Sequence, residues 1–370
     1  MGLQRRWANT PMEASSLQPL CDRQLPPLPG GSVSAAYGTA LLLGLGARID
    51  MPAPVDPADA LMDWAQSGLM YLCGEGGQPR LGPGVIPSCA RGALDALRVI
   101  APTLPPDLDG ARLLSERAGL MGLRARGTTS PNGSCHLLRA LDGWVAINLA
   151  REDDHGLLPA WLESDLARAS VEQLRPLVAR RDLATLVERG RLLGLPVAPA
   201  SGCAGAAHWY RVQCLGQRAA LRQAGAAPLV VDLSSLWAGP LCSHLLQSAG
   251  ARVIKVESTG RLDGARRGNA DFYNLLHAGK ESVVLDLQQP AGIEQLLGLL
   301  HTADIVIEGS RPRALRQLGI DAEALVAEVP GLTWVAISGY GRDGPGQHWV
   351  AFGDDAAAAA GVCEACLLYT

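Results

Sequence analysis

The sequence predicts an α/β protein: a Rossmann-like parallel sheet with crossover helices, plus a smaller, mostly helical α+β region. Four short apolar strands alternate with amphipathic helices between Leu229 and Gly346. Small or glycine-rich turns follow these strands. Parallel strands cannot be joined by a tight turn and need a crossover helix, so this alternation indicates a parallel sheet. Residues 31–199 hold mostly helical patterns, which places the smaller region first.

The predicted sheet begins with LVVDL at residues 229–233, and the turn SSLWAGP follows it. A helix is expected to start near Pro240. Small residues let a ligand approach the backbone there, and a helix N-terminus favours anions such as phosphate. The next strand, RVIKVES at residues 252–258, places Lys255 among apolar residues. Its ammonium therefore needs an anion, and Glu257 of a neighbouring chain or loop is one candidate.

Three arginines lie in the glycine-rich loop after this strand: Arg261, Arg266 and Arg267. Their guanidinium groups could bind phosphates bidentately, or the loop could be solvated. The last strand of the run, WVAIS at residues 334–338, leads into the glycine-rich turn GYGRDGP. Such a turn allows close approach of a ligand to the backbone.

Length and composition narrow the function classes. The chain has 370 residues, which suits two domains or one large one. A net charge of -4 offers no basic surface for nucleic acid. No apolar run is long enough for a transmembrane helix, and no apolar core follows the charged N-terminus as in a signal peptide. The nine cysteines lack framework spacing, which favours reduced thiols in the cytoplasm.

One Cys-x-x-Cys pair is present, Cys363 and Cys366. A single pair is half a zinc site, and no second pair accompanies it, so no metal is expected.

Five regions are predicted along the chain. Residues 1–30 form a polar, proline-rich arm, and residues 31–200 form the mostly helical region. A linker is expected over residues 201–227, where Gly, Ala, Gln and Cys are common. Residues 228–361 form the sheet half. The segment 362–370 follows no pattern of the preceding region and is expected to be a non-native tail.

An internal repeat is also predicted. TALLLGLGARI (Thr39–Ile49) aligns without gaps with SHLLQSAGARV (Ser243–Val253), and both suggest a helix that ends at a glycine. A looser match joins Asp59–Gly68 to Gly353–Gly361. The two blocks are close together in the first copy and far apart in the second, so the first copy lacks the sheet core. Chance agreement of two Ala- and Leu-rich helices is the alternative.

The motifs of the second half resemble those of the family III CoA-transferases, a group that includes formyl-CoA transferase, carnitine CoA-transferase and 2-methylacyl-CoA racemase. The motifs are Asp-x-x-x-x-x-Ala-Gly-Pro from Asp232, VIKVE from Val253, GKESVVLDL from Gly279, ADIVIEGSRP from Ala303 and VAISGYGRDGP from Val335. No single motif is specific for the family, but the presence of all five in the family's order and spacing is. The resemblance is strong over residues 228–361. It is weak over residues 31–199, where DGWVAI and GLPVAP are similar to the family's smaller, acyl-pocket domain.

The resemblance implies that coenzyme A is bound at the ends of the strands. The CoA contacts that it implies are Trp237, Ala238, Ser258, Leu285, Asp286, Leu287, Arg311, Ser338 and Gly339. The first turn would contact the nucleotide and pantetheine, the Leu-Asp-Leu segment the adenosine, and the Ser-Gly pair the thioester. Arg311 is the leading phosphate ligand. Ser258 stands where some members have an arginine that meets the adenine nucleotide.

Members of the family transfer CoA through an aspartate, which forms a mixed anhydride and then an aspartyl-CoA thioester. The resemblance places this aspartate, in an Asp-x-x-x-Gly helix start, beyond Thr370 in the second copy. In the first copy Ser88 occupies its position, with Gly92 four residues later. Asp354 and Asp355 are expected to cap the Ala-rich helix that follows them. The catalytic residue is therefore unknown, and a duplicated-module protein truncated at its C-terminus is expected.

An acyl-CoA:carboxylate CoA-transferase is the leading hypothesis, with acyl-CoA and carboxylic acids as substrates. A non-catalytic CoA-binding or structural partner is the alternative that Ser88 favours. A 2-methylacyl-CoA racemase needs a His and Asp pair, and neither His277 nor His348 lies in a suitable loop. A dinucleotide-dependent dehydrogenase lacks its Gly-x-Gly-x-x-Gly motif. Because the family forms ring-like dimers, a homodimer or a pairing of two modules within one chain is expected.

Overall fold

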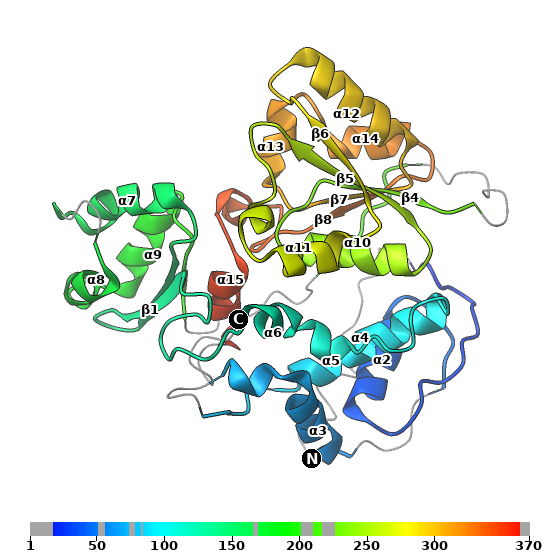
Figure 1. The fold of residues 1–370 in the computed structure, drawn as a ribbon, viewed down its shortest axis with the longest axis horizontal. Coiled ribbons are helices and arrows are strands. Elements are labelled where there is room, and N and C mark those ends of the chain that lie inside the picture. Colours follow the sequence, from blue (N-terminus) through cyan, green and yellow to red (C-terminus); the bar gives the residue numbers. More distant parts are fainter. Residues whose placement is uncertain are drawn as a thin grey trace.

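The computed structural model describes residues 18–50, 56–73, 78–82, 84–165, 169–200, 210–216 and 226–362. Figure 1 shows the five-stranded sheet and its helices above a layer of helices from the N-terminal region, with a three-stranded sheet beside them. Most of the predicted linker and arm, and the tail with Cys363 and Cys366, lie outside the described residues. No helix in the described ranges has the length and apolarity needed to cross a membrane.

Five parallel strands form the sheet of the second half, one more than the sequence predicts. They are β4 (Leu229–Asp232), β5 (Arg252–Ser258), β6 (Glu281–Leu285), β7 (Ile305–Glu308) and β8 (Thr333–Ala336). Their order across the sheet is β6-β5-β4-β7-β8, so the chain starts at the centre, moves to one edge and then to the other. This is the doubly wound, Rossmann-like arrangement that the sequence predicts.

Helices cover both faces of this sheet (Figure 1). On one face lie α10 (Ala238–Ser248) and α11 (Ala270–His277); on the other lie α12 (Pro290–Thr302), α13 (Pro312–Gln317) and α14 (Ala322–Glu328). Successive strand residues point to opposite faces. Val231 and Val306 therefore pack with Leu296 of α12, whereas Val230 packs with Leu246 of α10. Both faces are apolar, as expected for strands buried on two sides.

The smaller region contains an antiparallel sheet of β1 (Cys135–Arg139), β2 (Trp144–Asn148) and β3 (Val197–Pro199). Its helices are α7 (Glu152–Leu162), α8 (Val171–Val178) and α9 (Leu183–Leu192). One face of the sheet, with Leu138 and Val145, packs on these helices. The other face, with Leu137 and Ala146, packs on Ala358 of α15 (Gly353–Ala359), which belongs to the second half of the chain. We refer to residues 135–200 as the small domain.

The N-terminal layer is helical. It contains α2 (Val33–Gly44), α3 (Ala58–Ser67), α4 (Ile86–Ile100), α5 (Gly110–Leu113) and α6 (Glu116–Met121). Short 3-10 helices occur at Leu69–Tyr71, Gly264–Arg267 and Pro345–His348. Helices α2 and α4 cross at Gly38 and Gly92, where a side chain on either residue would overlap the backbone of the other helix. The two glycines thus set the closeness of this crossing.

Equivalent hydrogen bonds end the two helices of the predicted repeat. Gly46 after α2 and Gly250 after α10 both have left-handed φ angles, 93° and 102°. In each copy the amide of the next residue donates to a carbonyl five residues earlier, Ala47 to Leu42 and Ala251 to Leu246, both at 3.0 Å. The chain then pairs in parallel in both copies: Arg48 bridges to Gln24, and Arg252 pairs with Leu229.

Candidate functional site

The carboxyl ends of the five parallel strands share one edge of the sheet, and the sequence-predicted CoA contacts follow these ends. Trp237 and Ala238 follow β4, Asp286 follows β6, Arg311 follows β7, and Ser338 follows β8. The chain leaves β4 toward one face and β7 toward the other, so the strand order reverses between these two neighbours. In open α/β sheets, ligands bind at this edge and at this switch point.

The loop between β4 and α10 is held in a strained shape by a buried carboxylate. Leu236 has a φ of 73°, which is unusual for a non-glycine residue, and its amide donates to Asp263 Oδ1 at 3.0 Å. Asp263 is fully buried and also accepts from the Ala265 amide at 2.9 Å. Trp237, next in the loop, packs edge-to-face on Phe272 with a ring separation of 6.2 Å. Ala238 is exposed at the start of α10.

The structure corrects the partner expected for Lys255. Its Nζ atom lies 3.2 Å from Asp263 Oδ2, and both side chains are almost completely buried. Glu257, the candidate considered from the sequence, instead accepts from Arg266 Nη2 at 2.5 Å and from its Nε at 3.0 Å. Both Arg266 and Arg267 are exposed, but the Arg266 guanidinium is already paired with Glu257.

A second buried network lies under the N-terminus of α10. Asp232 accepts from the Ser234 amide at 2.9 Å and from Ser243 Oγ at 2.5 Å. Lys280 Nζ lies 3.5 Å from Asp232 Oδ2 and donates to Ser243 Oγ at 2.7 Å. Burial opposes ionisation of Asp232, but Lys255, Ser234, Ser243 and Lys280 outweigh it and lower its pKa. Burial lowers the pKa of Lys280 to about 8.

The two histidines considered for proton transfer are placed differently. His277 is buried at the end of α11, where burial, Lys280 and Lys255 lower its pKa to about 4. His348 is exposed in the 3-10 helix after the glycine-rich turn. His277 Nε2 lies 3.9 Å from Asp263 Oδ2 in this buried network, whereas His348 has no aspartate partner among the described residues.

The residues expected along the adenosine lie together at the β5–β6 corner. Ser258 pairs with Leu285 in register, and the Thr259 amide donates to the Leu285 carbonyl at 2.9 Å. Asp286 is exposed and accepts from the Gln288 amide at 3.1 Å. Leu287 is half-buried against the core under α12. These residues are therefore adjacent to one another. The Asp286 carboxylate, however, already accepts a hydrogen bond within its own turn.

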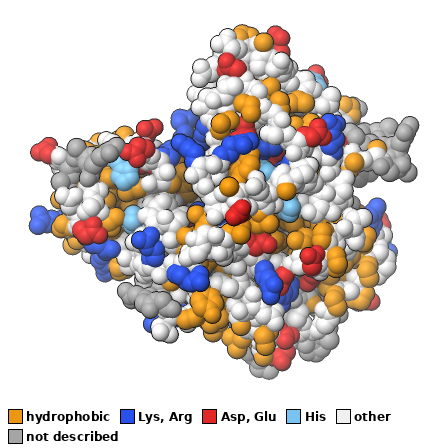
Figure 2. Space-filling model, in the orientation of Figure 1, with side chains coloured by type: hydrophobic (Ala, Val, Ile, Leu, Met, Phe, Trp, Pro, Cys, Tyr) orange, Lys and Arg blue, Asp and Glu red, His pale blue; other side chains and the backbone are white. Residues whose placement is uncertain are grey.

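Arg311, at the N-cap of α13, is the centre of a basic cluster. Burial, followed by repulsion from Arg313, Arg151 and Arg261, lowers the pKa of Arg311. No hydrogen bond or ion pair joins its guanidinium to another of the described residues. Figure 2 shows Lys and Arg side chains gathered over and beside α13. Arg151 comes from the N-cap of α7 in the small domain, so both sheets contribute to this cluster.

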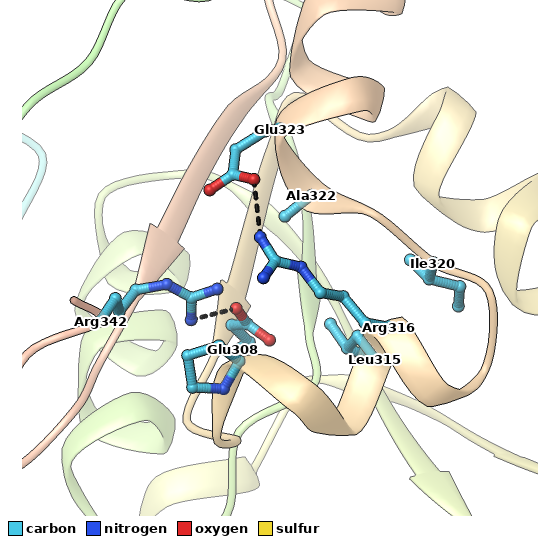
Figure 3. Close-up of a pocket in the computed structure, with 8 residues that line it drawn as sticks. Glu308, Leu315, Arg316, Ile320, Ala322, Glu323 and Arg342 are labelled. Carbon is cyan, nitrogen blue, oxygen red and sulfur yellow. Dashed lines mark hydrogen bonds and ion pairs between the residues drawn. The ribbon is translucent and has the colours of Figure 1, made fainter. Parts of the chain in front are cut away.

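In the pocket next to this cluster, the arginine side chains are paired with carboxylates (Figure 3). It is lined by residues of β7, α13 and α14 and by Arg342. Arg342 Nη1 donates to Glu308 Oε1 at 2.7 Å, and Arg316 Nη2 donates to Glu323 at 2.9 Å. Both arginines in the pocket are thus neutralised by carboxylates, unlike Arg311 outside it.

Ser338 and Gly339 follow β8 and are exposed. A side chain at Gly339 would overlap Ala351 of the same chain, so this glycine is explained by packing without a ligand. Its role at a thioester stays a prediction. Tyr340, the next residue, donates from its hydroxyl to Asp355 Oδ2 at 3.4 Å.

The candidate nucleophiles are buried. Ser88 is fully buried near the start of α4, and its hydroxyl has no partner among the described residues. Asp355 accepts from the Phe352 amide at 2.8 Å at the start of α15, in the capping position that the sequence predicts. Burial raises the pKa of Asp355 to about 7. Asp354 beside it is also buried.

The sequence did not reveal Asp263, Arg151 or Arg191 as residues near the site. Asp263 precedes a glycine, and its bond to the Ala265 amide forms a local turn that Asp-Gly pairs favour. That turn could have been predicted, but the contact with Lys255 depends on how the loop folds back. Arg151 and Arg191 belong to the small domain, and only tertiary structure brings them to the second half.

A doubly wound sheet with a basic cluster at its carboxyl edge is typical of α/β domains that bind phosphorylated ligands. A sequence profile of CoA-transferase family III matches residues 228–367, so this part of the chain is similar to that family. The match ends inside the segment expected to be a non-native tail. Among the described residues, no cluster of His, Cys, Asp or Glu side chains could hold a metal ion.

Known relatives match a similar share of the chain. Succinyl-CoA–D-citramalate CoA-transferase of Chloroflexus aurantiacus is 35% identical over 140 residues, which are 36% of this chain and 35% of that protein. Human alpha-methylacyl-CoA racemase is 38% identical over 116 residues, covering 31% of this chain and 28% of that protein. The chain thus spans about a third of the length of these relatives.

Solved structures match over a similar share. A hypothetical protein from Mycobacterium tuberculosis is 34% identical, with a TM-score of 0.32, covering 34% of this chain and 36% of that one. A CaiB/BaiF family protein from Brucella suis is 32% identical, also with a TM-score of 0.32, covering 34% of this chain and 36% of that one.

Proposed function

We propose that this protein binds coenzyme A thioesters at the carboxyl edge of the five-stranded sheet and transfers CoA between carboxylic acids. The observation that carries the proposal is Arg311, a half-buried guanidinium without an acidic partner among the described residues, whose pKa is lowered by burial and by the charges of Arg313, Arg151 and Arg261. Gathering like charges costs free energy unless an anion offsets it. Guanidinium groups match phosphate oxygens bidentately, which suits the phosphorylated end of CoA.

The remaining predicted contacts fit an extended ligand across the strand ends. We propose that Trp237 and Ala238 meet the ligand at the start of α10, where backbone amides and the helix dipole favour anions. Ser258 and Leu285–Leu287 would line the adenosine, and Ser338 with Gly339 would lie by the thioester. Support comes from their placement after neighbouring strands along one edge.

The proposed chemistry is covalent catalysis by an aspartate. Its carboxylate attacks the thioester carbonyl, and the CoA thiolate leaves to give an acyl-aspartyl anhydride. The thiolate then attacks the aspartyl carbonyl, which releases the first carboxylic acid and leaves aspartyl-CoA. The acceptor carboxylate repeats the two steps in reverse and departs as its CoA thioester. We place this aspartate in the Asp-x-x-x-Gly segment that the family has after the matched part of the module.

We also propose that residues 31–200 are a degenerate first copy of the module. The matched helix ends, and the parallel pairing of Gln24 with Arg48 where Leu229 pairs with Arg252, support a reduced β-α-β unit. The burial of Ser88 supports a first copy without chemistry of its own. Contacts of α15 with β2 and β3 support pairing of the two halves within one chain. A cytoplasmic location, with reduced cysteines, stays a prediction.

Calorimetric titration with CoA and with adenosine 3′,5′-bisphosphate tests the binding site. Arg311→Ala should weaken both ligands by about tenfold to a hundredfold, the worth of a lost charge-assisted hydrogen bond. Arg316→Ala, in the neighbouring pocket but already paired with Glu323, should bind within about twofold of the wild type. Wild-type protein that binds neither ligand, or Arg311→Ala binding that matches it, would overturn the proposal.

A non-catalytic CoA-binding protein is the second candidate, favoured by the buried Ser88. Transfer of CoA from succinyl-CoA to a panel of carboxylates, measured by chromatography with protein that carries the Asp-x-x-x-Gly segment, separates the two. Binding without turnover would favour the second candidate. The racemase reading has the likeness to human alpha-methylacyl-CoA racemase in its favour. The burial of His277 in a network with Asp263 and Lys280 weighs against it, because a proton-transfer histidine must reach the substrate.

A further inference from the structure

A stacked contact joins the small domain to the loop that follows β8. The guanidinium carbon of Arg191, near the end of α9, lies 3.5 Å from the centre of the Trp349 ring. The same carbon lies 5.6 Å from the centre of the Tyr340 ring. Tyr340 and Trp349 pack edge-to-face at 5.3 Å. One cation thus contacts both aromatic residues that close the glycine-rich turn.

The other side of this turn is fixed by α15. The Tyr340 hydroxyl donates to Asp355 of α15 at 3.4 Å, and Gly339 abuts Ala351. Figure 1 shows α15 between the three-stranded and five-stranded sheets. Ser338 and Gly339 immediately precede Tyr340, so the position of its ring determines where these two exposed residues lie. The Ser338–Trp349 turn is therefore held between the small domain and α15.

We propose that Arg191 is a positioning residue through which the small domain sets the Ser338–Gly339 segment against the thioester end of a bound acyl-CoA. This rests on the proposed function. Arg191 does not touch the ligand itself. Arg311, the proposed phosphate ligand, follows β7 rather than β8, although Arg151 of the small domain also belongs to its basic cluster. Loss of Arg191 should therefore affect the thioester end of the ligand more than the phosphate end.

Measuring the affinities for two ligands of different length distinguishes effects at the thioester end from effects at the phosphate end. Arg191→Ala should weaken CoA by roughly fivefold to thirtyfold, the worth of a desolvated cation–π contact. It should leave adenosine 3′,5′-bisphosphate within about twofold of wild type, since that ligand lacks pantetheine. Arg189→Ala is the matched control on the same helix, because Arg189 forms an exposed ion pair with Glu163. This control should bind both ligands as the wild type does.

The Arg191→Lys variant distinguishes loss of the stacked contact from a general folding defect. It keeps the charge and the aliphatic stem but stacks less well, so it should recover part of the lost CoA affinity. Amide hydrogen exchange over residues 338–349 should become faster in Arg191→Ala and stay unchanged in Arg189→Ala. This measurement needs no ligand, so it tests the contact even if the wild type binds no CoA, which would refute only the proposed function.

Two results would overturn the positioning role. In the first, Arg191→Ala binds CoA as tightly as the wild type, with unchanged exchange in the turn. In the second, both ligands weaken equally, which would make Arg191 a general structural residue. A selective loss for CoA, partly restored by lysine, supports the proposal.

Discussion

Asp263→Asn removes one charge from one of the two almost completely buried ion pairs near the site. Lys255 and Asp263 have side chains that are 1% and 0% exposed, and their charged atoms are 3.2 Å apart. Removing one partner of a buried pair usually costs 3–5 kcal/mol, because the remaining charge is uncompensated. The Asn amide oxygen can still accept from Leu236 and Ala265. We therefore expect a loss at the lower end, about 3 kcal/mol of unfolding free energy.

Guanidinium denaturation followed by circular dichroism measures this loss, and a double-mutant cycle assigns it to the pair. Lys255→Met should also destabilise, but the double variant should cost about 2 kcal/mol less than the two single variants together. Glu281→Gln is the control, because its pair with Arg252 is more than half exposed and is worth at most about 1 kcal/mol. A loss below about 1 kcal/mol for Asp263→Asn, or strict additivity in the double variant, would refute the reasoning.

Two further predictions concern packing and pH. Burial raises the pKa of Asp355 to about 7, above its ordinary value of 3.8, so its contribution to stability is lost as pH rises through that window. In denaturant titrations, the unfolding free energy of Asp355→Asn should equal that of the wild type near pH 4 and exceed it by a few kcal/mol above about pH 7. An equal difference at both pH values would contradict this. Gly92→Ala should cost about 1–3 kcal/mol, because its methyl group would overlap the Ser34 carbonyl in α2. Gly119→Ala, in open space on α6, should be neutral or slightly stabilising by the same measurement, and an equal loss there would remove the crossing as the cause.

Local patterns made the sheet predictable. Apolar strands, small turns and helix-ending glycines are read from neighbouring residues, and Gly250 adopts the left-handed conformation that its position predicts. Strand β6 is less apolar than the central strands. β6 lies at the edge of the sheet, and Glu281, Ser282 and Val284 are exposed, so the segment lacks the apolar continuity of the central strands.

The site was only partly predictable. Motifs place Arg311 at a strand end, but its lack of an acidic partner is a property of the folded neighbourhood. Lys255 was rightly expected to need an anion, yet the choice of Asp263 over Glu257 depends on where the 259–264 loop returns. Arg266 was weighed as a phosphate ligand or a solvated side chain and is instead paired. Contacts between segments far apart in sequence carry no local signature.

The packing of α15 on the three-stranded sheet has a consequence for how the chain folds. Leu137 and Ala146 face Ala358, so one face of an early-synthesised sheet stays uncovered until the last part of the described chain has emerged. Long-range closure of this kind is slow, since the intervening chain must be ordered before the contact forms. During synthesis the small domain would expose an apolar surface that is prone to aggregation or to capture by chaperones. Expressing residues 135–200 alone would leave that surface permanently open.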